Sequence, residues 1–395
     1  MKRRIFLKSS LVASSTLMMP AFLKSGFGQS RLSSRSGKIL VVVQLSGGND
    51  GLNTIVPYEN DIYYKNRPTL AIPKKEVLKL DGGLGLNPNL GALRNLYENG
   101  ELSIINSVGY PNPNRSHFRS MDIWQTASAS DEFLSTGWLG RYLDSECETC
   151  PVYQAVEVDD GLSLAMKGAH RNAFAMSDIS KMRKAANNKY LKKISQLAEP
   201  EEHNVAYLYK TLADTQQSTD YLYEKSKVYS SKTTYPNSSM GKDFKQIAEL
   251  ITTDISTQIY YLSLGGFDTH SGQQKKQGKL LKEYSEAVGA FVKDLKANNL
   301  FKDVVIMTFS EFGRRVNQNA SGGTDHGTAN NVFLMGGQLK KAGFYNEAAD
   351  LSNLANQDLI YDIDFREIYA TVLDKCLHAN SKAILKGNFK GLSIL

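Results

Sequence analysis

The sequence predicts an α/β protein with a doubly wound, mostly parallel central sheet and helices on both faces. Short apolar segments of four to seven residues recur along the chain, as expected of strands that are covered on both faces. Amphipathic segments with helical periodicity lie between them. Alternation of these two kinds of segment is typical of doubly wound sheets.

Five segments are predicted to form the strands of this sheet. Each is short, largely apolar and bounded by glycine or polar turn residues. Most of them lack strict alternation of polar and apolar residues, which favours buried positions in the sheet. The segments are residues 39–45, 102–108, 258–264, 304–309 and 332–335.

Helices are predicted between these strands. Residues 279–295 place Leu281, Tyr284 and Phe291 on one stripe, with lysine and glutamate opposite. Asp364 stands before a second amphipathic segment as a capping residue. Residues 151–240 differ, because they are rich in lysine, asparagine and tyrosine. We interpret them as a mainly helical subdomain inserted into a single domain of residues 30–395.

The N-terminal segment has the order of charges and apolar residues of a twin-arginine export signal. Arg3 and Arg4 are followed by Lys8 and then by a short apolar stretch rich in serine and alanine. We predict a signal peptide over residues 1–29, passage through the twin-arginine translocase, and a periplasmic or extracellular location. Nothing later in the sequence is long and apolar enough for an integral membrane segment.

Charge and cysteine content narrow the classes of function. The net charge of +7 falls to +2 when the five basic residues of the first 29 positions are set aside, so nucleic acid is not an expected partner. Cys147 and Cys150 either close a small disulfide in an oxidising compartment or remain free thiols. A zinc site there would need two further ligands that the neighbouring sequence lacks.

Polar side chains that suit a metal site lie next to the predicted strands. Ligands of an open parallel sheet bind outside the carboxyl ends of its strands. Carboxylates that are buried together without a cation would repel one another, and oxygen and imidazole ligands suit Zn²⁺, Mn²⁺ or a similar divalent ion. The candidate metal ligands are Asp50, Asp268, His270, Glu311, Asp325 and His326.

The segment beyond the second predicted strand supplies the candidate catalytic residues Arg115, Ser116 and His117. Ser116 is either the N-cap of an amphipathic helix or a nucleophile whose developing charge would face backbone N–H groups and the metal. Arg115 and Arg119 either hold an anionic substrate or are solvated surface charges. The glycines of residues 46–51 lack the spacing of a dinucleotide-binding loop.

Several motifs occur together in one order along the chain. They are LSGGNDGLN at 45–53, RSHF at 115–118, DIWQ at 122–125, GFDTH at 266–270, FSEFGR at 309–314 and TDHG at 324–327. With the twin-arginine start, this combination resembles the domain of unknown function 1501 (DUF1501) family, over nearly the whole mature chain. That family is similar to the alkaline phosphatase and sulfatase superfamily.

The resemblance implies a doubly wound α/β sandwich and a metal-assisted hydrolase. It implies that Asp50 is the carboxylate ligand after the first strand, and that Asp268, His270 and His326 are further ligands. Ser116 lies nearest the position of the nucleophile. The chain departs from the superfamily pattern at Ser310-Glu311, where an Asp-His pair is usual, and it lacks the sulfatase signature Cys-x-Pro-x-Arg.

The sequence therefore leads to an exported, metal-dependent, hydrolase-like protein that acts on anionic phosphate or sulfate esters. The alternative is a catalytically degenerate protein of the cell envelope that binds a glycan or a partner. The irregular ligand spacing and the tyrosine-rich insertion motivate that alternative. A serine esterase of the Gly-Asp-Ser-Leu type is a third hypothesis, but the nucleophile block expected early in such a chain is absent.

Overall fold

A computed structural model of the chain describes residues 38–189 and 203–395, with side chains of 203–211 left aside. The predicted signal peptide at 1–29 lies outside the described residues, as do residues 190–202 of the predicted insertion. Residues from Gly37 to Leu395 form one compact unit. This unit holds every candidate site residue.

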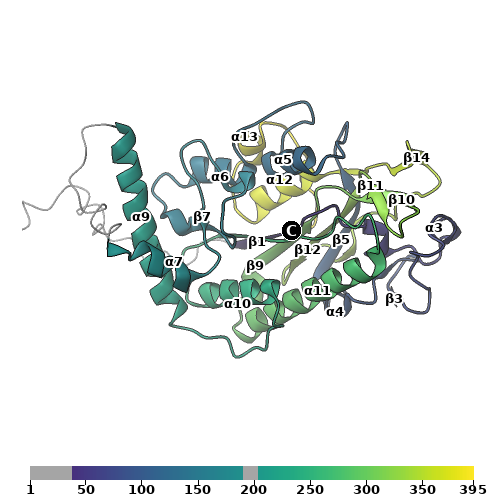
Figure 1. Cartoon of the computed structure of the whole chain (residues 1–395), viewed down its shortest axis with the longest axis horizontal. Coiled ribbons are helices and arrows are strands. Elements are labelled where there is room, and N and C mark those ends of the chain that lie inside the picture. The colour runs from purple at the N-terminus through teal and green to yellow at the C-terminus, as the bar shows by residue number, and fades with distance from the viewer. Residues whose placement is uncertain (1–37, 190–202) are drawn as a thin grey trace, which may run out of the picture. The chain divides into compact units, whose positions relative to one another are not determined.

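The core of the unit is a nine-stranded sheet with helices on both faces (Figure 1). This architecture confirms the predicted fold class, and each of the five predicted segments is a strand to within two residues at either end. A ninth strand, β16 (Ile363–Asp364), pairs with β5. The others, in spatial order, are β13 (Gly343–Phe344), β5 (Leu102–Gly109), β12 (Asn330–Gly336), β9 (Val304–Phe309), β1 (Ile39–Leu45), β8 (Ile259–Leu264), β6 (Ala155–Glu157) and β7 (Phe174–Ala175).

The central strands are parallel except for β12. Strand β1 pairs in parallel with both β8 and β9, whereas β12 runs antiparallel to both β9 and β5. The chain enters β12 from a hairpin of β10 (Arg314–Gln318) and β11 (Thr324–His326). Because β12 is reversed, the residues before it lie at the same edge as the carboxyl ends of its parallel neighbours.

Alternating residues of β1 face two hydrophobic cores. Val41 and Val43 pack in the core formed with α4 (Gly91–Glu98), α10 (Ser239–Thr252) and α11 (Gln273–Ala297). Leu40 and Val42 face the other core. The helices on that side are α5 (His117–Thr126), α6 (Trp138–Glu146), α12 (Phe365–Lys375) and α13 (Ser381–Leu385) (Figure 1). The predicted helices at 279–295 and after Asp364 fall within α11 and α12, and Asp364 caps α12 through its side chain.

Smaller elements surround this sandwich. Helix α3 (Asp61–Asn66) lies near a three-stranded sheet of β2 (Ile55–Val56), β4 (Gly85–Leu86) and β3 (Leu78–Lys79). Strands β14 (Leu354–Ala355) and β15 (Asp358–Leu359) form a hairpin. Short 3₁₀ turns occupy Gly51–Asn53, Val152–Gln154, Leu164–Met166 and Phe301–Asp303.

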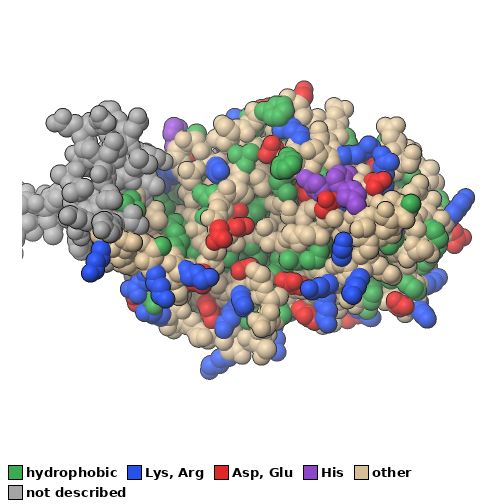
Figure 2. Space-filling view, viewed as in Figure 1, with side chains coloured by type: hydrophobic (Ala, Val, Ile, Leu, Met, Phe, Trp, Pro, Cys, Tyr) green, Lys and Arg blue, Asp and Glu red, His purple; other side chains and the backbone are tan. Residues whose placement is uncertain are grey.

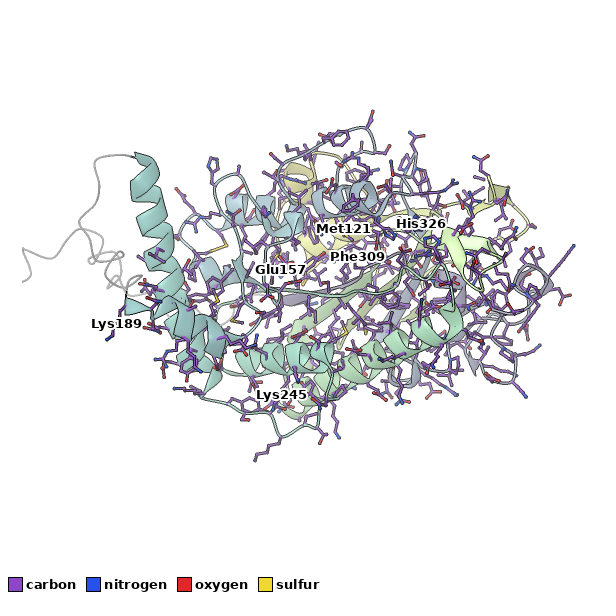
Figure 3. The ribbon with its side chains drawn as sticks, viewed as in Figure 1. Met121, Glu157, Lys189, Lys245, Phe309 and His326 are labelled. Carbon is purple, nitrogen blue, oxygen red and sulfur yellow. A yellow bond between two sulfur atoms is a disulfide. The ribbon has the colours of Figure 1, made fainter. Side chains whose placement is uncertain are left out.

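The segment interpreted as an insertion is divided between the sheet and a helical part. Strands β6 and β7 extend the main sheet beyond β8, and they are followed by α7 (Ile179–Ala186) and α9 (His203–Ser226). Cys147 and Cys150 form a disulfide just after α6 (Figure 3). Over the residues that the structure describes, we find no helix with the length and hydropathy needed to span a bilayer.

A buried carboxyl group at the end of β6 makes stability depend on pH. Glu157 is 4% exposed (labelled in Figure 3), and its Oε2 accepts hydrogen bonds from the backbone N and the Oγ of Ser163 at 2.7 and 3.1 Å. Burial raises the pKa of Glu157 to about 7, against the lowering effect of those hydrogen bonds. Between the ordinary carboxyl pKa and about 7, the folded chain keeps a proton that the unfolded chain loses.

The Glu157→Gln variant is therefore expected to lose a pH dependence that the parent chain has. As pH rises from about 5 to about 7.5, the free energy of unfolding of the parent should fall relative to the variant by up to about 3 kcal/mol. Urea unfolding at the two pH values measures this difference. Glu286→Gln, an exposed change on α11, is the control. Parallel pH profiles for the parent and Glu157→Gln would contradict the prediction.

Candidate functional site

A cluster of histidines surrounds one carboxylate oxygen at the edge of the sheet. Asp268 and His270 come from the loop after β8, His117 is the first residue of α5, and His326 is the last residue of β11. The Nε2 atoms of His117, His270 and His326 lie 3.3, 3.0 and 3.2 Å from Asp268 Oδ1. Figure 2 shows the histidines gathered in one patch on the surface, and Figure 3 labels His326.

Each of the three imidazoles has an oxygen on its other side. His117 Nδ1 lies 2.8 Å from Glu311 Oε1, and His326 Nδ1 lies 2.7 Å from the carbonyl oxygen of Arg115. His270 Nδ1 lies 3.5 Å from Asp325 Oδ1. Outer oxygen partners of this kind set the tautomer and the ring orientation of metal-ligating histidines.

The tautomer of His326 has a chemical consequence. A carbonyl oxygen only accepts hydrogen bonds, so His326 Nδ1 carries the proton that points to Arg115. Burial lowers the pKa of His326, and the charge of Arg314 acts in the same direction. In the resulting neutral ring, Nε2 is an acceptor that lies 2.9 Å from His270 Nε2 and 3.2 Å from Asp268 Oδ1. This lone pair can accept a hydrogen bond from His270 or bind a cation.

His117 also faces Asp268 through Nε2, but its pKa is shifted in the opposite direction. Its hydrogen bond to Glu311 raises the pKa of the ring, against the effect of burial. Its Nε2 is buried and has no hydrogen-bond partner among the described residues, although Asp268 Oδ1 is 3.3 Å away. One ligand atom each of His117, Asp268 and His326 lies within 4.8 Å of the others. Donors of a tetrahedral zinc ion, bound at about 2.0–2.1 Å, lie about 3.3 Å apart, so this donor set fits such an ion.

Arg314 forms an ion pair with Asp268 and fixes the position of its carboxylate. Its side chain is fully buried and donates to the carbonyl oxygens of Gly47, Gly48, Phe267 and Thr324. Arg314 Nη2 also donates a hydrogen bond to Asp268 Oδ1 at 2.8 Å. Although partial burial raises the pKa of Asp268, the hydrogen bond from Arg314 and the charge of its guanidinium hold that pKa well below its usual range. Asp268 is thus ionised at neutral pH.

Glycine at position 47 is required by the approach of two loops. Gly47 has φ of +116°, and a Cβ there would lie 2.5 Å from the backbone N of Asp268. The backbone N–H of Gly47 donates to Glu311 Oε1 at 2.9 Å. The loop after β1 thereby contacts both Asp268 and the carboxylate that orients His117.

Asp50 lies outside this cluster. Its Oδ2 forms a fully buried salt bridge with Arg67 Nη1 at 2.6 Å and a hydrogen bond with Gln273, while Oδ1 accepts from the backbone N of Leu52 at 3.2 Å. Both oxygens of the carboxylate are therefore satisfied by the protein. We assign Asp50 to this internal network rather than to the ligands of the cluster.

Glu311 and Asp325 face the Nδ1 atoms of His117 and His270, whereas Asp268 faces the Nε2 atoms. Glu311 is buried and contacts His117 and the backbone N–H of Gly47, which makes it a positioning residue. Asp325 accepts from Asn319 Nδ2 at 3.2 Å as well as facing His270. The hydrogen bond from Asn319 lowers the pKa of Asp325.

The candidate catalytic residues have different surroundings. Ser116 occupies the N-cap position of α5, and its exposed hydroxyl makes no capping hydrogen bond. Arg115 is half-buried and pairs with Asp358, which also lies 3.6 Å from Arg315 Nε. Two arginines therefore lie against one buried carboxylate. Arg119, in contrast, donates to three backbone carbonyls.

Sequence reasoning assigned no role to Arg314, Arg67 or Gln273. Arg314 ends the FSEFGR motif, and its place within a motif was the one signal that pointed to it. Arg67 directly follows α3 and Gln273 begins α11, and nothing in the sequence marks either residue as a partner of Asp50.

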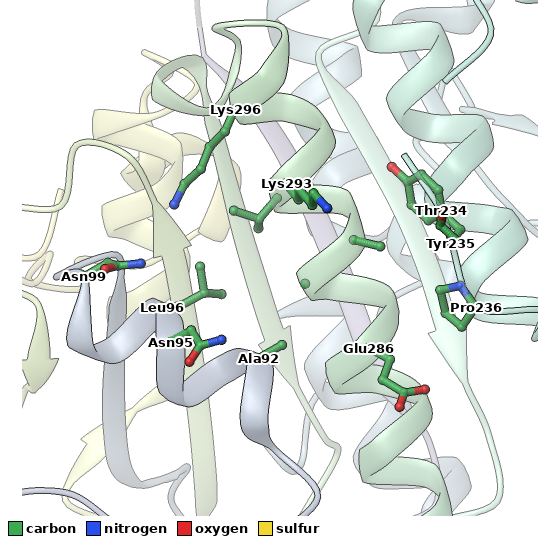
Figure 4. A pocket seen from close by; sticks show the side chains of 13 residues that line it. Ala92, Asn95, Leu96, Asn99, Thr234, Tyr235, Pro236, Glu286, Lys293 and Lys296 are labelled. Atoms are coloured by element: carbon green, nitrogen blue, oxygen red, sulfur yellow. The ribbon is translucent and has the colours of Figure 1, made fainter. Parts of the chain in front are cut away.

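A separate groove of about 640 Å³ lies between α4, α11 and residues 234–236 (Figure 4). Its lining is mostly apolar, with Glu286, Lys293 and Lys296 among the polar residues. None of the residues that line it belongs to the histidine cluster.

Comparison with known proteins gives one family and several distant structures. A family model described as "Protein of unknown function (DUF1501)" matches residues 104–388. No curated protein matches the sequence. Among solved structures, the Ps i-CgsB protein is 8% identical, with 89% of this chain and 75% of that chain covered and a TM-score of 0.43.

Two further structures have comparable scores. The PsFucS1 sulfatase from Pseudoalteromonas sp. is 11% identical, with 92% and 74% of the two chains covered and a TM-score of 0.39. The C-terminal periplasmic domain of EptC from Escherichia coli is 10% identical, with 90% and 88% covered and a TM-score of 0.39.

Proposed function

The chain belongs to the DUF1501 family of proteins of unknown function, and from the geometry of its histidine cluster we propose that it is an exported, metal-dependent hydrolase of phosphate or sulfate esters. The observation that carries the proposal is the convergence of three imidazole Nε2 atoms on Asp268 Oδ1. The export part rests on the twin-arginine pattern of residues 1–29 and assigns a periplasmic or extracellular location.

The ligands that we propose are His117, Asp268, His270 and His326. Glu311, Asp325 and the Arg115 carbonyl orient the three rings from outside. Imidazole nitrogen with one carboxylate suits Zn²⁺ and also Mn²⁺. A bound divalent ion would supply Lewis-acid stabilisation of the charge on the phosphoryl or sulfuryl group.

The chain's own residues would position the ester. The N-terminus of α5 presents backbone N–H groups next to His117, and such groups favour an anion. Arg115 and Arg315 add positive charge on the side of His326, which attracts an anionic substrate. The hydroxyl of Ser116, which caps nothing, is the nucleophile that we propose, and because this residue is exposed its proton would pass to solvent water.

The test is elemental analysis of the natively purified protein together with turnover of aryl phosphate and aryl sulfate. We expect about one equivalent of Zn or Mn in the parent chain. His326→Ala should lower the metal content and reduce turnover at least about 100-fold. His170→Ala removes an exposed histidine outside the cluster and should change neither quantity.

The outcomes separate the two candidate functions. Metal-free parent protein would overturn the proposed centre. Stoichiometric metal that depends on His326, without turnover of either ester class, would support the alternative of a non-catalytic protein of the cell envelope that binds a glycan or a partner.

A further inference from the structure

Two phenylalanines are exposed, one at the start of α5 and one in the loop that follows this helix. Phe118 follows His117 directly in α5 and is 87% exposed, and Phe133 in the loop after α5 is 78% exposed. Figure 2 shows exposed hydrophobic side chains close to the histidine patch on this face. Leaving two aromatic rings in water forgoes the hydrophobic free energy of burial, and exposed apolar groups next to a polar site mark binding surfaces.

The loop that carries Phe133 is held in a defined position by Arg119. The guanidinium of Arg119 donates to the carbonyl oxygens of Ala129, Ser130 and Glu132 at 3.3, 3.0 and 2.5 Å. The same group lies over the ring of Phe133, with Cζ 3.8 Å from the ring centroid. One face of the ring is therefore covered by a cation, and the remaining exposed surface is held ready for a ligand at little further entropy cost.

The charges around Phe133 indicate which ligand fits. Asp131 and Glu132 immediately precede it, and both are exposed. Two carboxylates repel an anionic group at this position, which disfavours an anionic lipid bilayer and requires that the ester group of a ligand lie away from Phe133. Carboxylates are good acceptors for hydroxyl groups, whereas the C–H face of a sugar ring packs against an aromatic face. The combination of exposed rings and flanking acceptors suits a polyhydroxylated ring.

We propose that Phe118 and Phe133 form a stacking platform for a saccharide that carries the ester group, so that the substrate class is a phosphorylated or sulfated glycan. This inference rests on the proposed function for the ester part alone. The platform itself binds the sugar rings next to the esterified position, and it does so whether or not the ester is hydrolysed.

The test uses saturation-transfer NMR on the natively loaded protein with neutral cellohexaose, maltohexaose and chitohexaose. We expect saturation transfer to the sugar C–H protons for at least one hexasaccharide, reduced at least about fivefold in the double variant Phe118→Ala/Phe133→Ala. Both rings are exposed, so their removal should leave the fold intact. Phe118→Tyr/Phe133→Tyr should keep the signal, as should Val228→Ala, which alters an exposed residue 73% accessible in another segment.

Two results would overturn the platform: equal signals from the parent and the double alanine variant, or no signal from any of the hexasaccharides. Flotation with phosphatidylglycerol vesicles that is lost in the double alanine variant would also overturn it, in favour of a membrane surface. Release of phosphate or sulfate from methyl phosphate and methyl sulfate, which lack a ring, is measured in parallel. Sugar binding without ester release would contradict the proposed function and support the platform. Ester release without sugar binding would contradict the platform and support the proposed function.

Discussion

Replacement of Asp268 by asparagine is expected to abolish metal retention and to reduce ester turnover at least about 10³-fold. Asp268 Oδ1 is the one atom that the three imidazole Nε2 atoms and Arg314 Nη2 share, at 2.8 to 3.3 Å. An amide oxygen preserves the shape of the side chain but removes the negative charge. The positive charges of a divalent ion and of Arg314 would then lack their common counter-ion.

The measurement compares metal content and kcat/KM for Asp268→Asn and Asp325→Asn. Asp325 faces His270 from outside at 3.5 Å, so its replacement should cost about 10–100-fold in metal affinity, well short of the effect at Asp268. This pair of variants distinguishes a ligand from an orienting residue with the same chemical change. Full metal occupancy in Asp268→Asn would contradict the assignment of Asp268 as a ligand.

The strands of the central sheet were predictable because they are buried on both faces. The prediction for 39–45 agrees with β1 at both ends, since every residue of that segment is apolar or buried. Strands β6, β7 and β13 were not predicted, because two or three residues are too few to show a periodicity. They form through pairing with longer neighbours, which is a tertiary effect.

The edge at which the histidines meet was also predictable, but for a reason that the sequence only partly reveals. Asp268 and His270 follow a parallel strand, as the rule for open sheets requires. His326 precedes a strand and reaches the same edge because β12 runs antiparallel. The direction of β12 depends on the hairpin of β10 and β11, in which Arg314 and His326 are paired.

The partners of individual carboxylates could not be predicted from spacing. Asp50 and Asp268 both follow central strands, so residue type and position in the sequence do not distinguish them. The structure places Arg67 against Asp50 with both side chains fully buried, whereas Asp268 remains 48% exposed at its side chain among the imidazoles. Which carboxylate is neutralised internally depends on where a distant arginine folds, and periodicity carries no such information.

The buried Arg314 gives the second large effect, this time on stability. Arg314→Met is expected to lower the free energy of unfolding by about 3–5 kcal/mol, the range for breaking a buried charged network. Methionine is shorter and uncharged, so the change keeps an unbranched apolar stem but removes the guanidinium that donates to the carbonyl oxygens of Gly47, Gly48, Phe267 and Thr324. Each buried acceptor that loses a donor is costly, and these acceptors belong to the loops after β1 and β8 and to strand β11.

Urea unfolding of metal-free protein measures this effect without a contribution from bound ions. The control is Arg94→Met, which removes an exposed pair with Glu98 on α4 and should cost less than about 1 kcal/mol. Arg314→Lys restores the positive charge, but one ammonium group cannot reach all the acceptors that the planar guanidinium reaches. We therefore expect a stability between those of the parent and Arg314→Met. A stability of Arg314→Met within about 1 kcal/mol of the parent would show that the two loops and β11 are held by other contacts.

The double variant Arg314→Met/Asp268→Asn decides how the two halves of the site depend on each other. Asp268 Oδ1 accepts from Arg314 Nη2 at 2.8 Å, so each single change leaves an unpaired charge that the double change removes. The loss in the double variant should therefore be smaller than the sum of the two single losses. Additive losses would mean that Arg314 stabilises the loops without holding Asp268, and the orientation of that carboxylate toward the histidines would need another cause.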